Sequence, residues 1–174
     1  MNRIFKNVIV ELRPSIITPS GIGVFSATSI KKGVVIFEGI HASYFKHLIS
    51  WKDFELLPKN TKKKVLAFCV GTPKGFIPPD KNNFNELSIE WYLNHSCVGN
   101  IGFDYNGDFV TIKDIKCNTE LTYDYGLIET NPKFQMNCVC GESKCRKIIT
   151  GNDWKYLINI PEKFKIMHPQ LKKE

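Results

Sequence analysis

The 174-residue sequence predicts a mostly β fold with a minor α-helical part. Short runs rich in β-branched and aromatic residues recur along the chain and are separated by glycine, proline and asparagine, which is typical of short strands joined by turns. Within the segment 101–112, Asn106-Gly107 separates two such runs, and Asn-Gly is the strongest local signal for a β-hairpin. Helix-like spacing of apolar residues is found in one patch only, within 45–70.

The chain begins with a predicted strand at 8–12, which we expect to stop at the Arg13-Pro14 dipeptide. The next segment, 20–26, carries two glycines one residue apart. Glycine permits positive φ and a close approach of the backbone to a ligand. Because no helical pattern follows these glycines, a dinucleotide-binding fold is not expected.

Two turns of similar sequence, 30–33 and 115–118, each precede a strand-like run. The first turn leads into the predicted strand 34–37, and the second leads into the run 121–125. We interpret both as strand, tight turn and strand.

The helical patch in 45–70 is interrupted by Pro58, so we expect helix on both sides of that residue. The following segment, 71–85, is rich in glycine, proline and asparagine and is interpreted as a loop. Four lysines gather at 59–64 without interleaved aromatic residues, which favours a solvated helix face over a base-stacking platform.

Composition is that of an ordinary soluble globular chain, with 43% hydrophobic and 24% charged residues and a length suited to one domain. No apolar run has the roughly 20 residues of a membrane span, and the N-terminus lacks the apolar core of a secretory signal. We therefore expect an intracellular protein, cytoplasmic or nuclear and chromosomal, with export into a host cell left open. The net charge of +7 is compatible with acidic or nucleic-acid-associated partners, but direct nucleic-acid binding stays an open question.

Asn94, His95, Ser96 and Cys97 place an amide, an imidazole, a hydroxyl and a thiol on consecutive residues, directly after the apolar run 89–93. Side chains of a strand alternate between its two faces, so at least two of the four must face inward. Each would need a partner, because an unpaired buried polar group costs about 1–3 kcal/mol.

The later stretch 120–126 alternates like a strand and places Tyr123 and Tyr125 on the same face. Two tyrosines at this spacing are more often ordinary packing, and a histidine after an apolar run is more often a hydrogen-bonded core residue than a ligand. A functional interpretation of these residues therefore depends on the other motifs of the chain.

The segment 138–145 contains three cysteines in the pattern C-x-C-x4-C. In a chain without a secretory signal, clustered thiols bind metal more often than they form disulfides. Three thiolates leave a tetrahedral zinc ion one ligand short, since structural zinc sites close with four. A fourth ligand must come from elsewhere in the chain.

Three further cysteines are candidates for that ligand. Cys69 lies in an apolar run and is interpreted as a small buried hydrophobe, and Cys117 lies in a turn. Cys97 lies among polar residues that require partners, so we favour it. A site with three cysteines and one histidine, or a redox role for the thiols, remains the alternative.

Taken together, these motifs resemble those of SET-domain protein lysine methyltransferases with a post-SET zinc segment. The motifs are Gly-Ile-Gly-Val-Phe at 21–25, Asn-His-Ser-Cys at 94–97 with Asn100, Glu-Leu-Thr-Tyr-Asp-Tyr-Gly at 120–126, and C-x-C-x4-C at 138–145 with Arg146. Four motifs in the order of the family, over roughly 8–151, make chance agreement improbable. The resemblance implies a SET domain at 1–135 with a helical and loop insert at about 45–88, a post-SET zinc segment at 136–151 and a C-terminal tail at 152–174.

The resemblance also implies a fold of several small sheets, in which a late segment is threaded in a pseudoknot-like way, and a set of site residues. By similarity, Tyr125 would be the catalytic tyrosine and Tyr123 would govern how many methyl groups are added. S-adenosylmethionine would be bound by Gly21, Ile22, Gly23, Val24, Asn94, His95 and Tyr125. A structural zinc ion would be held by Cys97, Cys138, Cys140 and Cys145.

The sequence departs from the family pattern in three places. Gly99 stands where proline is usual, and Asn118 lies in a turn that commonly contains glycine, although asparagine tolerates the left-handed conformation. Gly39 stands where the family often has an active-site tyrosine. Another aromatic side chain would then have to wall the lysine channel, and the candidates are Phe37, Tyr44 and Tyr105.

These residues lead us to expect an S-adenosylmethionine-dependent protein-lysine N-methyltransferase. Its partner would be a protein with an exposed lysine-containing segment, such as a histone or another basic protein, in a nucleosome or a ribosome. The main products would be mono- and dimethyl-lysine. The alternatives are a catalytically weak, zinc-stabilised protein-interaction module and a methyltransferase of a non-histone protein such as a ribosomal component.

Overall fold

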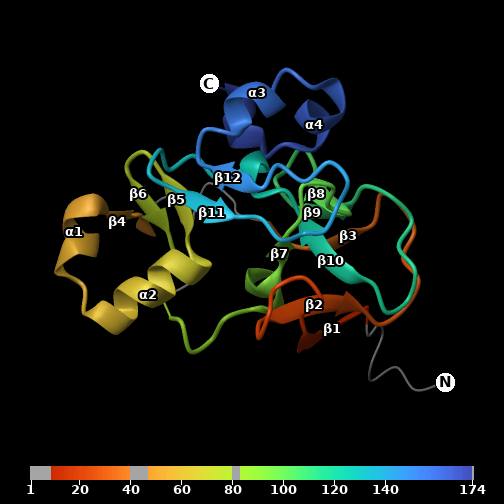
Figure 1. Ribbon diagram of the computed structural model, residues 1–174, viewed down its shortest axis with the longest axis horizontal. Coiled ribbons are helices and arrows are strands. Elements are labelled where there is room, and N and C mark those ends of the chain that lie inside the picture. Colours follow the sequence, from red (N-terminus) through yellow and green to blue (C-terminus); the bar gives the residue numbers. More distant parts are fainter. Residues whose placement is uncertain (1–8, 40–46, 80–82, 174) are drawn as a thin grey trace.

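The computed structural model describes residues 9–39, 47–79 and 83–173 (Figure 1). Its chain is mostly β, with several small sheets and short helices, and this confirms the predicted fold class. Within the described residues, no helix combines the length and apolarity that a membrane span requires.

The largest sheet holds seven strands in the order β1-β2-β10-β8-β9-β3, and β7 also pairs with β10. Its strands are β1 (Val10–Pro14), β2 (Ile22–Ser26), β3 (Val35–Phe37), β7 (Asn94–His95), β8 (Ile101–Phe103), β9 (Phe109–Thr111) and β10 (Glu120–Tyr123). The late strand β10 pairs with three strands, β2, β7 and β8, and lies inside the sheet. This central position of a late segment agrees with the threaded arrangement that the family resemblance implies.

The first strand continues further than predicted. It includes Arg13 and Pro14, which pair with Gly23 and Ile22 of β2. Because β1 is an edge strand, the missing N–H of proline leaves no ladder hydrogen bond unmade in the interior of the sheet. Val8, the first residue of the predicted strand, lies outside the described residues.

The two similar turns are confirmed as strand, turn and strand, and they lie side by side. An antiparallel bridge joins Ile30 to Ile115, with backbone hydrogen bonds of 2.9 and 2.8 Å between them. Asn118 has φ of +64°, the left-handed conformation expected for it. The second run ends as a strand at Tyr123, earlier than the predicted Tyr125.

The predicted hairpin is also present, although its strands are shorter than the sequence indicates. β8 and β9 pair as far as Phe103 and Phe109, so the connection is longer than Asn-Gly alone. The Asp104 carboxylate accepts hydrogen bonds from the backbone N–H groups of Asn106, Gly107 and Asp108 and thereby fixes this turn.

The segment 49–77 contains helix on both sides of Pro58, as predicted. Its elements are β4 (Ile49–Ser50), α1 (Trp51–Leu56), α2 (Lys59–Phe68), β5 (Val70–Thr72) and β6 (Gly75–Ile77). The interpretation of 71–85 as a loop is wrong for its first part, because β5 and β6 form a hairpin that pairs with β4. Gly75 makes this pairing possible, since a Cβ atom there would collide with the carbonyl oxygen of Ile49.

The C-terminal part packs onto the main sheet. It contains the hairpin β11 (Gln135–Asn137) and β12 (Ile148–Thr150), the helices α3 (Trp154–Leu157) and α4 (Pro161–Ile166), and the 3₁₀ helix η5 (Pro169–Lys173). Leu157, Met167 and Leu171 are buried in the same apolar cluster as the residues of β2, β8 and β10. Figure 1 shows α3 and α4 above β12.

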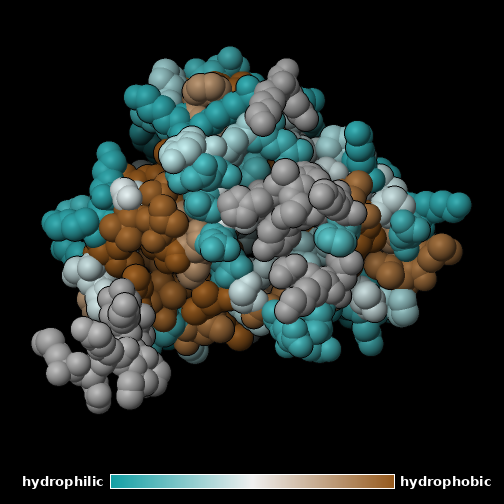
Figure 2. Space-filling model, turned by 180° about the vertical axis from the view of Figure 1, so that it is seen from behind, coloured by the Kyte–Doolittle hydropathy of each residue, from teal (hydrophilic) through white to brown (hydrophobic). Residues whose placement is uncertain are grey.

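Most of the rear face in Figure 2 is hydrophilic, and apolar residues gather on one part of it. Large apolar side chains that are half exposed occur in the strands at the edges of the main sheet, for example Val35 in β3 at 50% and Leu12 in β1 at 43%. The interior, by contrast, is an ordinary apolar core centred on Val24, Ile101 and Leu121, which are fully buried.

Candidate active site and metal centre

The two polar stretches singled out in the sequence lie against each other. Asn94 and His95 in β7 pair in parallel with Thr122 and Tyr123 in β10. Asn100 joins the two stretches further, because its side-chain amide donates to the carbonyl oxygen of Glu120 and accepts from the N–H of Thr122, both at 2.9 Å. The main chain of β10 is thereby fixed just before its tyrosines.

His95 connects the second tyrosine with a cysteine. Its Nδ1 atom accepts a hydrogen bond from the backbone N–H of Tyr125 at 3.1 Å, so the ring proton resides on Nε2. Nε2 lies 3.4 Å from Sγ of Cys97 and can donate to it. Burial lowers the pKa of His95 to about 4, in spite of the nearby Asp124 carboxylate. The 4.0 Å approach of Nδ1 to Asp124 is therefore not an ion pair at neutral pH.

Tyr123 and Tyr125 lie side by side, with ring centroids 4.9 Å apart. Tyr125 begins the short 3₁₀ helix η4 (Tyr125–Leu127), which follows β10. Its hydroxyl donates to the carbonyl oxygen of Leu93 at 3.0 Å. Burial raises the pKa of both phenols above the ordinary value, so they stay protonated at neutral pH. The two hydroxyl groups can orient a ligand by hydrogen bonding, but they are not phenolate bases that could take up a proton.

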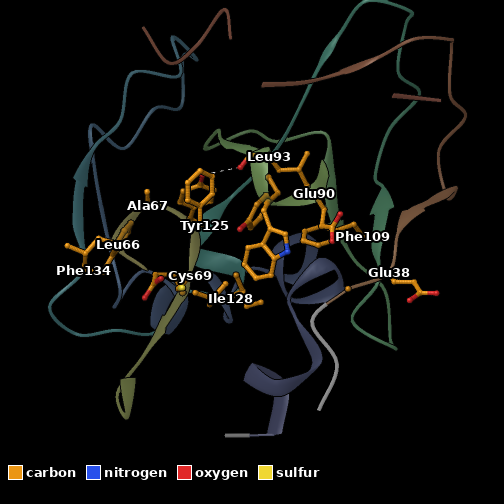
Figure 3. Close-up of a pocket in the computed structure, with 16 residues that line it drawn as sticks. Glu38, Leu66, Ala67, Cys69, Glu90, Leu93, Phe109, Tyr125, Ile128 and Phe134 are labelled. Carbon is orange, nitrogen blue, oxygen red and sulfur yellow. Dashed lines mark hydrogen bonds between the residues drawn. The ribbon is translucent and has the colours of Figure 1, made fainter. Parts of the chain in front are cut away.

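Tyr125 lines a pocket of about 80 Å³ to which six aromatic residues contribute (Figure 3). Its aromatic lining consists of Phe68, Trp91, Phe109, Tyr123, Tyr125 and Phe134. Leu66 and Phe134 lie at one end of the pocket and Phe109 at the other, with Tyr125 between them. Such walls exclude water and suit a slender, partly apolar side chain.

Tyr125 also belongs to a second cavity, of about 180 Å³. Asn94 and His95 line this cavity, together with Ile17 and Thr18 from the loop that follows β1. Tyr125 is the residue that lines both cavities, so two ligands bound in them would meet at its ring.

The predicted glycine segment is connected to this second cavity by a hydrogen bond to Asn94, which lines the cavity. The Asn94 amide donates to the carbonyl oxygen of Ile22 at 3.0 Å and to Oε1 of Glu120 at 2.8 Å. A Cβ atom at Gly23 would collide with the Glu120 carboxylate, so glycine is required for this approach. The residues 21–24 themselves are not part of the cavity wall, in contrast to Asn94, His95 and Tyr125.

A buried ionic network lies beside the tyrosines. The Asp124 carboxylate is 1% exposed and accepts hydrogen bonds from both terminal nitrogens of Arg146. It also accepts one from the Nζ atom of Lys163 in α4, at 2.9 Å. Burial alone would raise the pKa of Asp124, but Arg146 and Lys163 hold it below its usual value. Lys163 also donates to the carbonyl oxygen of Cys97 at 3.0 Å. The C-terminal helix α4 is thereby tied to the residue between the two tyrosines.

The four cysteines proposed as zinc ligands come together, as the sequence predicts. The Sγ atoms of Cys97, Cys138, Cys140 and Cys145 all lie within 4.8 Å of one another. Tetrahedral zinc with Zn–S bonds of about 2.3 Å requires S–S separations of roughly 3.8 Å, and the Cys97–Cys138 separation is 3.7 Å. This donor set fits a zinc ion, and the backbone N–H of Arg146 points at Sγ of Cys97 from 3.3 Å.

The other two cysteines lie elsewhere. Cys117 is exposed and donates to the carbonyl oxygen of Ala27. Cys69 lines the aromatic pocket, and burial raises the pKa of its thiol to about 12, so it stays protonated. Neither residue competes for the metal position.

Comparison with known proteins identifies the family. The family model described as SET domain matches residues 21–126, which is more than half of the chain. The protein belongs to the SET domain family.

Two relatives illustrate how far the likeness extends. The human protein named Histone-lysine N-methyltransferase SETDB2 is 39% identical over a match that covers 37% of this chain and 11% of its own length. A humanized mutant of the Chaetomium thermophilum Polycomb Repressive Complex 2, solved with the inhibitor GSK126, gives a TM-score of 0.48 at 24% identity and covers 70% of this chain and 15% of that one. This SET protein therefore spans only a small part of either relative.

The structure leaves no room for a side chain at Gly39, the position where the resemblance implies a tyrosine in other members of the family. A Cβ atom at Gly39 would collide with the carbonyl oxygen of Gly107, so the backbone of the β8–β9 turn occupies that space. Tyr105 is 84% exposed and Tyr44 lies outside the described residues, while Phe37 packs edge-on against Phe109. Phe109 is the aromatic residue that walls this end of the pocket.

Several residues of the site were not found from the sequence. Trp91 and Glu129 line the aromatic pocket, and Lys163 completes the Asp124 network. Asp124 lies between two tyrosines that face inward, so the sequence does indicate that its carboxylate needs a cationic partner. No local pattern shows that this partner lies in α4.

Proposed function

We propose that this SET protein transfers a methyl group from S-adenosylmethionine to the side-chain amine of a lysine in a histone or another basic protein. The observation that carries the proposal is the position of Tyr125. It lines both the aromatic pocket and the cavity that contains Asn94 and His95. A lysine in the first and a cofactor in the second would approach each other at one tyrosine ring, and such alignment of two reactants is the main task of a transferase.

The chemistry assigned to each cavity follows from its lining. S-adenosylmethionine, when bound, supplies an activated methyl group on a positively charged sulfur. Asn94 and His95 would hold it, in a cavity closed on one side by the loop with Ile17 and Thr18. The cavity offers such a ligand the His95 ring and apolar side chains as contact surface, and hydrogen bonds to protein groups hold Asn94 and His95 in place there.

The aromatic pocket would prepare the nucleophile. A lysine ammonium has no lone pair, and its reference pKa is near 10.4. Low polarity disfavours the charged form, so the rings of Trp91, Tyr123 and Tyr125 would favour loss of the lysine proton to water, against the opposite effect of the carboxylates that line the same pocket. The Tyr125 hydroxyl and the Leu93 carbonyl would then orient the neutral amine.

The name of the human relative supports histone as the first substrate to test. The decisive experiment incubates the purified protein with radiolabelled S-adenosylmethionine and, separately, core histones, nucleosomes and ribosomal proteins, followed by mass spectrometry of the labelled band. We expect label on lysine with wild-type protein and its loss or strong reduction with Tyr125→Phe. Cofactor binding without transfer to any protein would contradict the proposal and support a zinc-stabilised interaction module.

A further inference from the structure

The buried carboxylate of Asp124 helps to hold the backbone that carries Tyr125. Asp124 precedes the 3₁₀ helix η4 and caps it, because its Oδ1 atom accepts a hydrogen bond from the N–H of Gly126 at 3.1 Å. A displaced Asp124 side chain would remove this cap. The loss would occur directly beside the residue that lines both cavities.

Two cations compensate the charge of this carboxylate, and they are not equivalent. Arg146 is shared between two carboxylates, since its Nε atom also donates to Asp153 at 3.0 Å. Lys163 forms its ion pair, among the residues that the structure describes, with Asp124. These four side chains carry two positive and two negative charges, and both carboxylates are almost fully buried. Loss of Lys163 would leave a buried negative charge in excess.

The second partner of Lys163 lies on the other polar stretch of the site. Its Nζ atom is 2.9 Å from Oδ2 of Asp124 and 3.0 Å from the carbonyl oxygen of Cys97. An ammonium group has three N–H donors, so it serves both oxygens at once. Both hydrogen bonds are strengthened by its charge. One side chain therefore bridges the stretches 94–97 and 120–126.

The helix that carries Lys163 is fixed by contacts that do not involve this side chain. Leu157 before α4 and Met167 after it are buried in the main apolar core. The N–H of His168 donates to the carbonyl oxygen of Leu127, the last residue of η4, at 3.0 Å. Because α4 is anchored on both sides, a substitution at Lys163 should leave the helix in place and remove only the bridge.

We propose that Lys163 is a positioning residue for the transfer: its ammonium group holds the Asp124 carboxylate against the Cys97 carbonyl and thereby holds Tyr125 where the two cavities meet. Lys163 lines neither cavity, so it acts through Asp124 and not by contact with a ligand. The inference rests on the proposed function for the identity of the reaction. The position of Tyr125, however, can be measured without any transfer.

The first test compares three variants. Lys163→Met keeps the approximate length of the side chain without its charge, and Lys163→Arg keeps the charge. Lys165→Met is the matched control, because Lys165 is an exposed lysine of the same helix and contributes no side chain to the Asp124 network.

The measurement is the initial rate of methyl transfer to core histones at varied substrate concentration. We expect Lys163→Met to lower kcat by roughly tenfold to a hundredfold with little change in KM, since a displaced Tyr125 misaligns reactants that still bind. Lys163→Arg should recover most of the rate, and Lys165→Met should behave as the wild type.

The second test follows Tyr125 directly by fluorine NMR of protein that contains fluorotyrosine. The resonances of Tyr125 and Tyr105 are assigned by their absence in Tyr125→Phe and Tyr105→Phe. In Lys163→Met the Tyr125 resonance should shift or broaden, and in Lys163→Arg it should return toward its wild-type position. Tyr105 is 84% exposed in the β8–β9 turn, so its resonance should stay unchanged.

Zinc content and thermal unfolding of the same samples show whether each variant is folded, and Lys163→Gln replaces Lys163→Met if the latter is not. Wild-type kcat together with an unmoved Tyr125 resonance in a folded neutral variant would overturn the inference. A rate that decreases only in proportion to the folded fraction would overturn it too, and so would an equal decrease in Lys165→Met. A Tyr125 resonance that depends on Lys163, in a protein that methylates no lysine, would count against the proposed function alone.

Discussion

The backbone N–H of Tyr125 donates a hydrogen bond to Nδ1 of His95, 30 residues earlier in the chain, over 3.1 Å. The other ring nitrogen of His95 lies 3.4 Å from Sγ of Cys97. One neutral imidazole therefore links the tyrosine that lines both cavities with a residue of the cysteine cluster. Through this ring, Tyr125 is connected to the cysteine cluster.

We expect His95→Ala and Asn94→Ala to weaken cofactor binding. The first leaves the N–H of Tyr125 without its acceptor, and the second releases the Ile22 carbonyl and the Glu120 carboxylate. The unpaired groups cost about 1–3 kcal/mol of folding stability, and the disturbed cavity wall should raise the Kd of the cofactor by roughly tenfold. Calorimetric titration with S-adenosylmethionine measures this, and an unchanged Kd in both variants would contradict the assignment of the cavity.

Tyr125→Phe should mainly slow the transfer. The variant keeps the ring that separates the two cavities but loses the hydroxyl that donates to the Leu93 carbonyl. If that hydroxyl orients the amine chiefly in the transition state, kcat falls while the Kd of the cofactor changes little. Single-turnover kinetics with saturating cofactor separates the two effects. A cofactor affinity that falls as much as kcat would show that the hydroxyl serves binding.

One zinc ion per chain is expected at the four-cysteine cluster. Its ligation joins Cys97 of the central region to the segment 138–145, so it should contribute directly to folding. Cys140→Ser should release the metal and disorder the chain after Tyr125. Cys117→Ser is the matched control, because Cys117 is exposed and outside the cluster.

Metal content by mass spectrometry and thermal unfolding provide the measurements. Full zinc stoichiometry in Cys97→Ser would mean that the fourth ligand is a different residue. Loss of zinc in the Cys117→Ser control would show that the cluster is not the metal site.

The features that could be predicted from the sequence are mainly those that depend on the pattern of neighbouring residues. The hairpin around Asn106-Gly107 and the helices on either side of Pro58 follow from neighbouring residues, and both are present. The cysteine spacing in 138–145, together with the preference for Cys97 over Cys69 and Cys117, predicted four cysteines whose Sγ atoms lie close together in the structure. The first two inferences need only the chain a few residues to either side, whereas Cys97 lies 41 residues before Cys138 and was selected by weighing the three remaining cysteines.

The remaining features depend on contacts that no local pattern encodes. The hairpin of β5 and β6 contains Gly75, and glycine made this segment look like a loop in the sequence. Glycine is required there because a Cβ atom would collide with the carbonyl oxygen of Ile49, which lies in β4. Likewise, the link between Asp124 and Lys163 joins residues 39 apart in different elements. The reason for Gly39 became visible only with the backbone of Gly107 in place.

Glu129 should make stability depend on pH. Burial raises the pKa of this carboxyl to about 7, whereas in the unfolded chain it is about 4.3. Between these values the folded protein holds a proton that the unfolded chain has lost, so the free energy of unfolding decreases as pH rises from about 4.5 to 7. The full effect is roughly 4 kcal/mol by the linkage relation.

We expect Glu129→Gln to remove this decrease of the free energy of unfolding with pH. The measurement is urea unfolding of the variant and of the wild type at several pH values. The absolute stability of the variant also changes, because one amide oxygen cannot accept from both Gly71 and Asn131 as the carboxylate does. The slope with pH is therefore the informative quantity. Glu162→Gln, at an exposed position, should leave the slope unchanged.

The last prediction concerns the product. Tyr123 lines the aromatic pocket, with its ring centroid 4.9 Å from that of Tyr125 and 5.6 Å from that of Phe109. Each added methyl group needs space, and the amine must turn its lone pair toward the donor before the next transfer. A tyrosine hydroxyl, or a water that it holds, fills this space and fixes the amine by a hydrogen bond of about 0.5–1.5 kcal/mol. That energy changes relative rates by roughly twofold to tenfold.

We therefore expect mono- and dimethyl-lysine as the main products of the wild type, and a shift toward higher methylation in Tyr123→Phe. Gly39 does not enlarge the pocket from the other side, because the backbone at Gly107 occupies the space beside it. Phe109→Leu is a useful comparison, since it widens the same wall without removing a hydroxyl. Mass spectrometry of the product at long reaction times distinguishes the cases. Abundant trimethyl-lysine from the wild type would show that the Tyr123 hydroxyl does not limit methylation.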